Sequence, residues 1–214
     1  MTATTDPHDI RSRTHTWRRP VPWAEAGDAS GLELLQKILK GELPDPPIGG
    51  TLGFRLVEAD EGRAVFEGDP GEHLLNPMGT VHGGFVATLL DSALGSAIAA
   101  ALPRGRVYTT MQLNIHLVRP VFAGTPALRC EGRTVHVGRT TATAEARVVG
   151  TADGKLYAHG TTTCAVMGPG RTGPPSATGG PTPQEEAGGE GEGSAPQGRG
   201  AAEGAAEGEG ITPS

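Results

Sequence analysis

Two stretches of the chain repeat apolar residues at the spacing of an α-helix. The first follows Ser30 and has leucine or isoleucine at positions 32, 35, 38 and 39, with Gly41 as the predicted end. Serine is favoured just before a helix and glycine just after one. The pattern therefore predicts a short amphipathic helix packed on the edge of a domain, with a partner-binding helix as the alternative.

The second helix is predicted from about His82-Gly83-Gly84 to Leu102, where Pro103 ends it. Its apolar residues cover nearly every face, which is typical of a buried helix. They are Val86, Ala87, Leu89, Leu90, Ala93, Leu94, Ala97, Ile98 and Ala101. Asp91 and several small polar residues interrupt the run, which favours a helix inside a domain over a membrane span.

Strand patterns flank this long helix. Two precede it, at residues 54–57 and 64–66, around a turn at Asp60-Glu61-Gly62-Arg63. Four follow it, at residues 107–118, 127–136, 140–149 and 156–166. The predicted class is α+β, with an antiparallel sheet of about five to six strands wrapped around the helix. Because the sheet covers one side of the helix only, a second copy of the chain is expected on the other side.

Residues 169–214 differ in composition from the rest. They contain no aromatic residue, no leucine and no valine, and Gly, Pro, Glu and Ala supply most of them. Such a segment cannot bury enough apolar area to offset the entropy lost on ordering. The chain is therefore predicted to comprise a flexible N-terminal segment at 1–29, a domain at 30–168 and a disordered acidic tail at 169–214.

The charge of the predicted domain excludes one class of function. The chain carries a net charge of −6, but the tail has seven glutamates against two arginines, so residues 1–168 are close to neutral. Such a domain lacks the basic surface of a nucleic-acid-binding protein. Cys130, Cys164 and the histidines show no metal-ligand spacing, and no signal peptide is recognisable. We expect reduced thiols, no metal, a cytoplasmic location, and no nucleic-acid or membrane partner.

Asp91 is the first candidate for chemistry. It lies between Leu89-Leu90 and Ala93-Leu94 on a helix otherwise suited to burial, and that helix contains no Arg or Lys. Burying an unpaired carboxylate costs free energy, and structural acids in such places usually have a basic partner. An acid kept in these surroundings is typical of an active site.

Gly83 and Gly84, at the start of the same helix, are the second candidate. The first backbone N–H groups of a helix have no partners within it and lie at the positive end of its dipole. Without side chains in the way, they can approach a carbonyl oxygen and stabilise negative charge that develops there. The alternatives are a phosphate site, or glycines that only allow close packing on the sheet.

The spacing of these candidates predicts a dimer. Gly83 and Asp91 are separated by roughly 12 Å along one helix, at about 1.5 Å per residue. Acyl transfer needs the oxyanion donor and the base each within about 3 Å of their reacting atoms. Two antiparallel copies of the helix can meet this requirement, with Gly83 of one subunit facing Asp91 of the other. If both residues act, the enzyme is a dimer with two shared sites.

The combined motif resembles one family. Asn76-Pro77-Met78-Gly79-Thr80-Val81-His82-Gly83-Gly84, followed by Ala87-Thr88-Leu89-Leu90-Asp91, is similar to the signature of the PaaI-type (phenylacetate-pathway) hotdog thioesterases. The run 111–120 resembles the family's third strand, and Gly138-Arg139-Thr140 resembles its turn between later strands. The resemblance covers about residues 30–167. It implies the hotdog fold, homodimers that commonly pair into tetramers, and acyl-CoA hydrolysis without a cofactor, since CoA is part of the substrate.

The resemblance also implies roles for single residues. Asp91 matches the acidic general base or nucleophile, and Gly83 matches the oxyanion-hole amide. His82 is similar to a residue that helps hold the thioester or the loop, and Asn76 to one that orients the attacking water or the carbonyl. Thr110 falls near the position of the water. Some relatives have Glu at the Asp91 position, which leaves open whether water or the carboxylate attacks first.

Three further residues are implied to bind substrate. They are Gly84, Gly138 and Arg139, of which Arg139 lies where a basic residue can meet the CoA phosphates. The predicted reaction converts an acyl-CoA, with an aryl or medium-chain acyl group, and water to a free acid and CoA. Two alternatives remain open: a hotdog hydroxyacyl-thioester dehydratase, whose site generally pairs a histidine with an acid, and a non-catalytic acyl-CoA-binding module. The chain has no Gly-x-Ser-x-Gly motif of a serine hydrolase.

Overall fold

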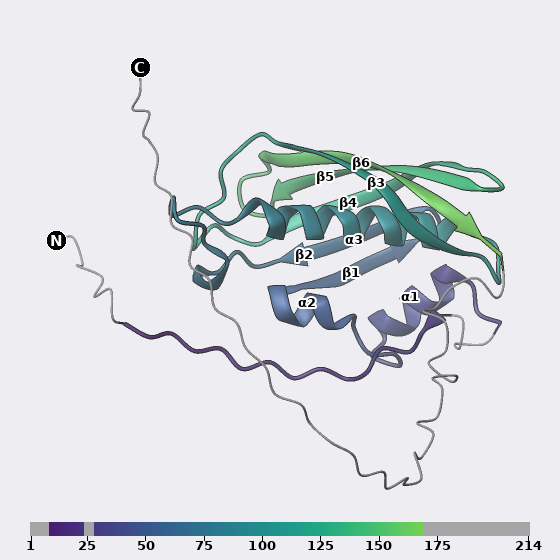
Figure 1. Ribbon diagram of the computed structural model, residues 1–214, viewed down its shortest axis with the longest axis horizontal. Helices are drawn as coiled ribbons and strands as arrows, with labels where there is room; N and C mark the ends of the chain where they lie inside the picture. The colour runs from purple at the N-terminus through teal and green to yellow at the C-terminus, as the bar shows by residue number, and fades with distance from the viewer. Residues whose placement is uncertain (1–8, 24–27, 169–214) are drawn as a thin grey trace, which may run out of the picture. The chain divides into compact units, whose positions relative to one another are not determined.

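One long helix packs against a six-stranded antiparallel sheet in the computed structural model of the chain (Figure 1). The structure describes residues 9–23 and 28–168, so the tail predicted at 169–214 lies outside the described residues. The strand order is β1-β2-β4-β5-β6-β3, and every neighbouring pair is antiparallel. The prediction of an α+β fold with this kind of sheet is confirmed.

The strands lie close to their predicted positions. Their bounds are β1 Phe54–Asp60, β2 Arg63–Gly68, β3 Val107–Leu117, β4 Leu128–Val137, β5 Thr141–Gly150 and β6 Leu156–Met167. The tight turn between β1 and β2 requires Gly62, whose φ of 66° lies in the left-handed region that favours glycine. Because β4 pairs with β2, β3 is left at the far edge of the sheet.

Helix α3 (Gly83–Ala101) supplies the centre of the core. It contacts all six strands, and four of its large side chains are fully buried: Leu89, Leu90, Leu94 and Ile98. It is long and apolar enough to span a membrane by composition, yet most of it is buried within the fold. Cys130 and Cys164 lie in the same core as free thiols, and burial raises the pKa of both.

Helix α1 (Gly31–Leu39) begins and ends where the sequence predicts. The Ser30 hydroxyl accepts a hydrogen bond from the Glu33 N–H at 3.3 Å, and the Glu33 carboxylate accepts one from the Ser30 N–H at 2.8 Å. This reciprocal pair satisfies two backbone donors at the start of the helix. The helix packs against α3 and β1, and Figure 1 shows it beside β1.

Helix α2 (Pro47–Leu52) is a departure from the prediction. No helix was predicted after Gly41 and before the first strand, but Pro47 occupies the first position of a new helix. A proline is well tolerated there because the N–H that it lacks would have no partner within the helix. Gly53, with a φ of 83°, ends α2 and leads into β1.

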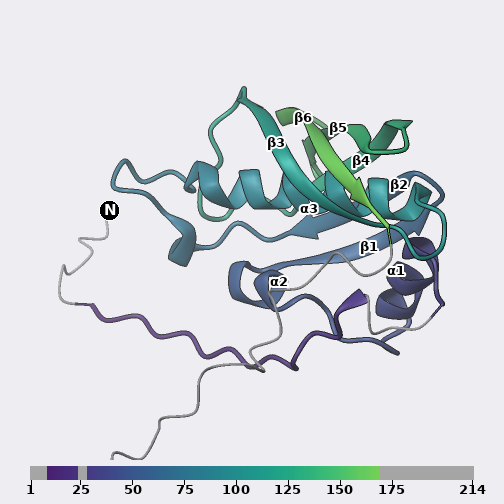
Figure 2. The same ribbon diagram turned by 45° about the vertical axis from the view of Figure 1, so that its right-hand side comes forward.

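The segment Asp9–Trp23, which we call the N-terminal arm, runs past α2 toward α1 (Figure 2). Arg13 donates to the backbone carbonyls of Thr51 at 3.2 Å and Gly50 at 3.3 Å. Trp23, at the end of the arm, is half-buried and packs against the core. The prediction of a flexible segment over 1–29 did not anticipate these contacts.

Strand β3 contains a β-bulge. Thr110 pairs with Cys164 and Gln112 pairs with Thr163, so Met111 is an extra residue with no partner in β6. The alternation of side chains therefore changes phase within the strand. Four of its residues face α3, two on either side of the bulge: Tyr108, Thr110, Leu113 and Ile115.

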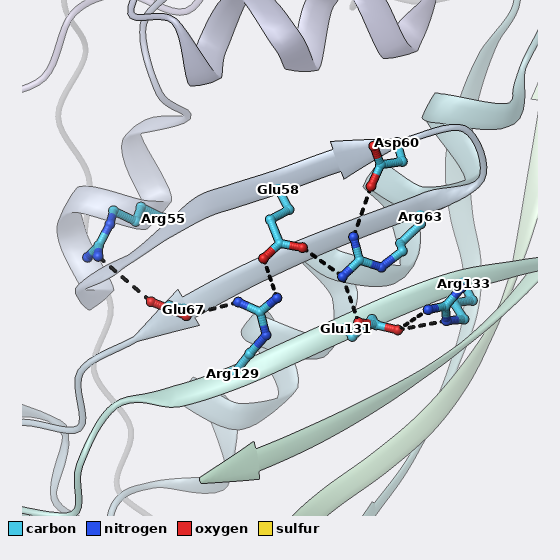
Figure 3. A network of polar contacts seen from close by, with 8 residues as sticks. All are labelled: Arg55, Glu58, Asp60, Arg63, Glu67, Arg129, Glu131 and Arg133. Carbon is cyan, nitrogen blue, oxygen red and sulfur yellow. Dashed lines mark hydrogen bonds and ion pairs between the residues drawn. The ribbon is translucent and has the colours of Figure 1, made fainter. Parts of the chain in front are cut away.

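A network of ion pairs crosses β1, β2 and β4 (Figure 3). Its members are Arg55, Glu58, Asp60, Arg63, Glu67, Arg129, Glu131 and Arg133. The Arg63 guanidinium pairs with three carboxylates at 2.7 to 3.0 Å. Strand alternation places the network on the sheet face away from α3, over the fully buried Val65. The network therefore covers the apolar part of that outer face.

We expect Arg63→Met to lower the free energy of unfolding by about 1–2 kcal/mol at pH 7, between the values for exposed and fully buried ion pairs. Hydrogen bonds from Arg129, the larger effect, and from Arg63 hold the pKa of Glu58 below its ordinary value of 4.5. Hydrogen bonds from Arg63, again the larger effect, and from Arg133 do the same for the pKa of Glu131. Carboxylates whose pKa is lowered by folding stabilise the fold above pH 4.5, and this stabilisation is lost as the pH falls below 4.5 and they become protonated.

The check is urea denaturation of both proteins between pH 7 and pH 3. The difference between wild type and Arg63→Met should shrink as the carboxylates become protonated. Arg55→Met is the matched control, because Arg55 is largely exposed and, among the residues that the structure describes, pairs with Glu67 alone, at 3.8 Å. Equal losses in the two variants would show that Arg63 has no special place in the network.

Candidate active site

Helix α3 leaves one stripe of its surface open in the single chain. Gly84 is exposed, and Ala87, Thr88 and Asp91 are half-buried, at the spacing i, i+3, i+4 and i+7. Asp91, which was predicted on a helix suited to burial, is therefore half-buried in one chain. The sheet buries the opposite side of the helix, and the small residues of the stripe remain accessible.

Asp91 is held by one hydrogen bond from β3. The Thr110 hydroxyl donates to Asp91 Oδ1 at 3.1 Å. No residue that the structure describes donates to the second carboxylate oxygen, Oδ2. A carboxylate fixed at one oxygen and open at the other can accept a proton from a bound water.

Tyr108 lies beside Asp91 and fits against a glycine of α3. A Cβ added at Gly95 would lie 2.5 Å from the Tyr108 hydroxyl oxygen, so only glycine leaves room for the phenol. Burial, followed by the neighbouring Cys164 and Asp91, raises the pKa of Tyr108 further above neutral pH than its ordinary value of 10.0. Tyr108 was not predicted as a site residue, although an aromatic residue two positions before Thr110 on a predicted strand was a usable signal.

A cavity of about 220 Å³ opens at Asp91. α3 supplies Asp91, Ser92 and Ser96 to its wall, and β3 supplies Tyr108 and Thr110. The rest of the lining is mostly apolar: Trp23, Leu35, Ile38, Ile48, Phe54, Leu56 and Phe66, from the arm, α1, α2, β1 and β2. None of these apolar residues was predicted as part of the site, because they come from five separate elements.

The start of α3 has one open backbone donor. His82 precedes the helix, and its Nδ1 accepts a hydrogen bond from the Gly84 N–H at 2.9 Å. The Phe85 N–H donates to the His82 carbonyl at 3.0 Å. Within residues 9–23 and 28–168, the Gly83 N–H has no acceptor. Of the glycine pair, Gly83 is the residue that can donate to a ligand, while the Gly84 N–H is engaged by His82.

The Asn76 side chain bonds within its own loop. Its Oδ1 accepts from the N–H groups of Met78 at 2.9 Å and Thr80 at 3.2 Å, and its Nδ2 donates to the Thr80 hydroxyl at 2.8 Å. These bonds use both acceptor positions of the amide oxygen and leave one N–H. In this chain Asn76 fixes the loop that leads to His82, and it does not line the Asp91 cavity.

Gly138 and Arg139 lie in the turn between β4 and β5. The Gly138 N–H donates to the Thr141 carbonyl at 2.8 Å, which closes the turn. Arg139 is exposed, and its carbonyl accepts a hydrogen bond from the Arg106 side chain. Neither residue lines the Asp91 cavity. The structure thus brings Asp91 and Thr110 together, and it leaves the other predicted site residues in separate groups within one chain.

Comparisons with known proteins agree on one family. The family model of the thioesterase superfamily matches residues 78–156. Human acyl-coenzyme A thioesterase 13 is 32% identical over 130 residues, which cover 59% of this chain and 89% of the relative. A Halobacterium salinarum protein, provisionally named an esterase, is 32% identical over 134 residues, which cover 60% of this chain and 83% of the relative.

Solved structures give the same result. The phenylacetic acid degradation-related protein of Ralstonia eutropha JMP134 superposes with a TM-score of 0.55 at 32% identity, over 61% of this chain and 98% of that one. A mutant of the phenylacetic acid degradation protein PaaI from Thermus thermophilus gives 0.51 at 31% identity, over 56% and 98%.

The chain belongs to the thioesterase superfamily. It is a hotdog-fold thioester hydrolase of the PaaI type, which confirms the family predicted from the sequence. The matched residues of this thioesterase include Gly83, Asp91 and Thr110, whereas Asn76 and Trp23 precede them.

We expect Thr110→Val to reduce kcat of this thioesterase about 10- to 100-fold. The substitution keeps the shape of the side chain but removes the hydroxyl that donates to Asp91, and a hydrogen bond to a charged group contributes about 1.5–3 kcal/mol. Steady-state kinetics on a cleaved acyl-CoA measures the loss. Thr110→Ser keeps the hydroxyl and should retain most activity; an equal loss in both variants would assign the effect to packing.

Proposed function

We propose that the protein hydrolyses an acyl-CoA to a free carboxylic acid and CoA, with Asp91 as general base and the Gly83 N–H as oxyanion donor. The observation that carries the proposal is the position of Asp91. It lies at an apolar cavity, with Thr110 on one carboxylate oxygen and the other oxygen open. An acyl group in the cavity would have its thioester carbonyl next to this carboxylate.

The chemistry follows from these positions. Asp91 Oδ2 takes a proton from a water molecule while the water oxygen attacks the carbonyl carbon. The carbonyl oxygen becomes negatively charged, and the Gly83 N–H, at the positive end of the α3 dipole, stabilises it. The tetrahedral intermediate then expels the CoA sulfur, which receives the proton from Asp91. The products are the carboxylic acid and CoA, and Asp91 returns to its starting state.

The proposal requires two subunits, because Gly83 and Asp91 lie roughly 12 Å apart on one helix. The surface around the start of α3 supports a dimer. Exposed apolar side chains come close to it on three segments of the chain, because Leu117 lies against Gly83, Leu75 pairs with Val81, and the Val81 N–H bonds to the carbonyl of the residue before Phe122. These side chains are Leu75, Met78, Leu117, Val118 and Phe122. Apolar surface of this kind is typical of a protein interface.

The other residues of the signature have supporting roles in the proposal. His82 holds the Gly84 N–H, which leaves the neighbouring Gly83 N–H directed at the substrate. Asn76 fixes the loop before His82. Arg139 lies beside Arg106 at an exposed turn, and two guanidinium groups suit the phosphates of CoA. The assembly is proposed to be a dimer that pairs further into a tetramer.

The test is thiol release from a panel of acyl-CoA esters, with the acid product identified by mass spectrometry. We expect release of free CoA and the matching acid. An enoyl thioester formed from a hydroxyacyl-CoA would instead identify a dehydratase. Tight binding of acyl-CoA without turnover would identify a binding module, and either outcome would overturn the proposal.

A further inference from the structure

The cavity at Asp91 has a wall that comes from outside the matched family region. Trp23, at the end of the N-terminal arm, lines the cavity together with Tyr108. The two rings meet edge to face, with centroids 6.4 Å apart and an angle of 68° between their planes. This geometry is favourable for aromatic pairs, so the indole has a defined place on the wall.

The Tyr108 ring that Trp23 contacts is itself fixed in position. The phenol is confined against Gly95, where a Cβ would meet the hydroxyl oxygen at 2.5 Å, and the residue packs against the core. Tyr108 is two residues before Thr110 on β3, and Thr110 bonds to Asp91. The order along this wall is therefore Asp91 and Thr110, then Tyr108, then Trp23.

The small size of the cavity limits the acyl groups that it can hold. Pockets that enclose a drug-sized ligand measure about 300–1,000 Å³, whereas this cavity measures about 220 Å³. A compact acyl group, such as one aromatic ring or a short chain, fits a space of this size. A longer chain that starts at Asp91 and runs along the wall would meet Tyr108 and then the indole of Trp23.

We propose that Trp23 is a specificity-determining residue, which closes the acyl cavity beyond Tyr108 and restricts the enzyme to compact acyl groups. The proposal rests on the function proposed above, because it takes the cavity at Asp91 as the acyl site. The N-terminal arm, which precedes the family-matched residues 78–156, thereby sets the substrate range of this chain.

The experiment compares kcat/KM for phenylacetyl-, hexanoyl- and decanoyl-CoA in wild type, Trp23→Phe and Trp23→Ala. We expect Trp23→Ala to raise the decanoyl-to-hexanoyl ratio at least about tenfold, since even one methylene changes such ratios about 10- to 200-fold in an apolar pocket. Trp23→Phe should lie between the two. A ratio from one preparation does not depend on the fraction of folded protein, so partial unfolding cannot produce the shift.

Trp17→Ala is the matched control. Trp17 belongs to the same arm, but it is 69% exposed and does not line the cavity. Its ratio should equal that of wild type. Suppose that the wild type cleaves acyl-CoA and depends on Asp91, but the ratio is unchanged in Trp23→Ala. That result would overturn the role proposed for Trp23 and leave the proposed function standing. A wild type that cleaves no acyl-CoA would overturn the proposed function instead.

Discussion

Asp91→Asn is expected to lower kcat for acyl-CoA hydrolysis by about two to four orders of magnitude, the usual contribution of a general base. Asparagine has almost the same shape as aspartate, and its amide oxygen can still accept the hydrogen bond from Thr110. The amide cannot take a proton from the attacking water. The loss should therefore appear in kcat, with KM little changed, when thiol release is followed with the best acyl-CoA of the panel.

Glu61→Gln is a suitable control for the Asp91 substitution. It removes one negative charge from the exposed turn between β1 and β2, away from the cavity. Its kcat should stay within about twofold of wild type, as surface substitutions usually have small effects. If Asp91→Asn retained more than a tenth of the wild-type kcat, Asp91 could not be the group that activates water.

Gly83→Pro should lower kcat about 10²- to 10³-fold, which is the usual effect of removing one oxyanion-hole donor. Proline removes the Gly83 N–H, and the backbone at this position suits a proline. Gly83 is the first residue of α3, where proline is favoured, and His82 has φ −59° and ψ 135°, which suits a residue before proline. The variant should fold normally and lose activity, as thermal unfolding and steady-state kinetics would show.

Gly83→Ala separates the lost N–H from the added bulk. Its Cβ would lie 2.8 Å from the Leu117 Cδ1, but Leu117 is 55% exposed and its flexible end can move aside. Alanine keeps the N–H, so this variant should retain most of its activity. Equal losses in the alanine and proline variants would mean that space at Gly83 matters and its N–H does not.

Asp91→Asn and Gly83→Pro, combined in one sample, test whether the site is shared between subunits. In a mixed dimer of Asp91→Asn and Gly83→Pro, one of the two sites would combine an intact Gly83 with an intact Asp91. Random pairing of equal amounts should restore about a quarter of wild-type activity, because half of the dimers are mixed and each has one intact site of two. If each chain formed its own site, refolding the variants together would restore nothing.

The long helix and the strands could be predicted because each has a regular apolar pattern. Asp91 stood out because it interrupts such a pattern, and Gly83 because a helix start offers free N–H groups. Their separation on one helix also predicted a second subunit, since the rise per residue fixes the distance between them. These inferences depend only on local periodicity and helix geometry.

The missed features depend on contacts between distant segments or on one-residue irregularities. Helix α2 was missed because proline ends one helix and can also begin another. Trp23 was missed because nothing in residues 1–29 repeats at a helical or strand spacing, and only its packing against Tyr108 gives it a role. The bulge at Met111 was missed because the alternation on either side of it is too short to show the change of phase.

That bulge determines where β3 can lose a single residue. Deleting the codon for Met111 would remove the extra residue and leave one regular alternation, in which Gln112 alone separates Thr110 from Leu113 and both still face α3. Deleting the codon for Asn114 would instead turn the residues on one side of the deletion to the opposite face of the sheet. Single deletions in this strand should therefore be tolerated at the bulge and not elsewhere. The extra residue marks the position in the edge strand at which a codon can be lost without changing which side chains face the core.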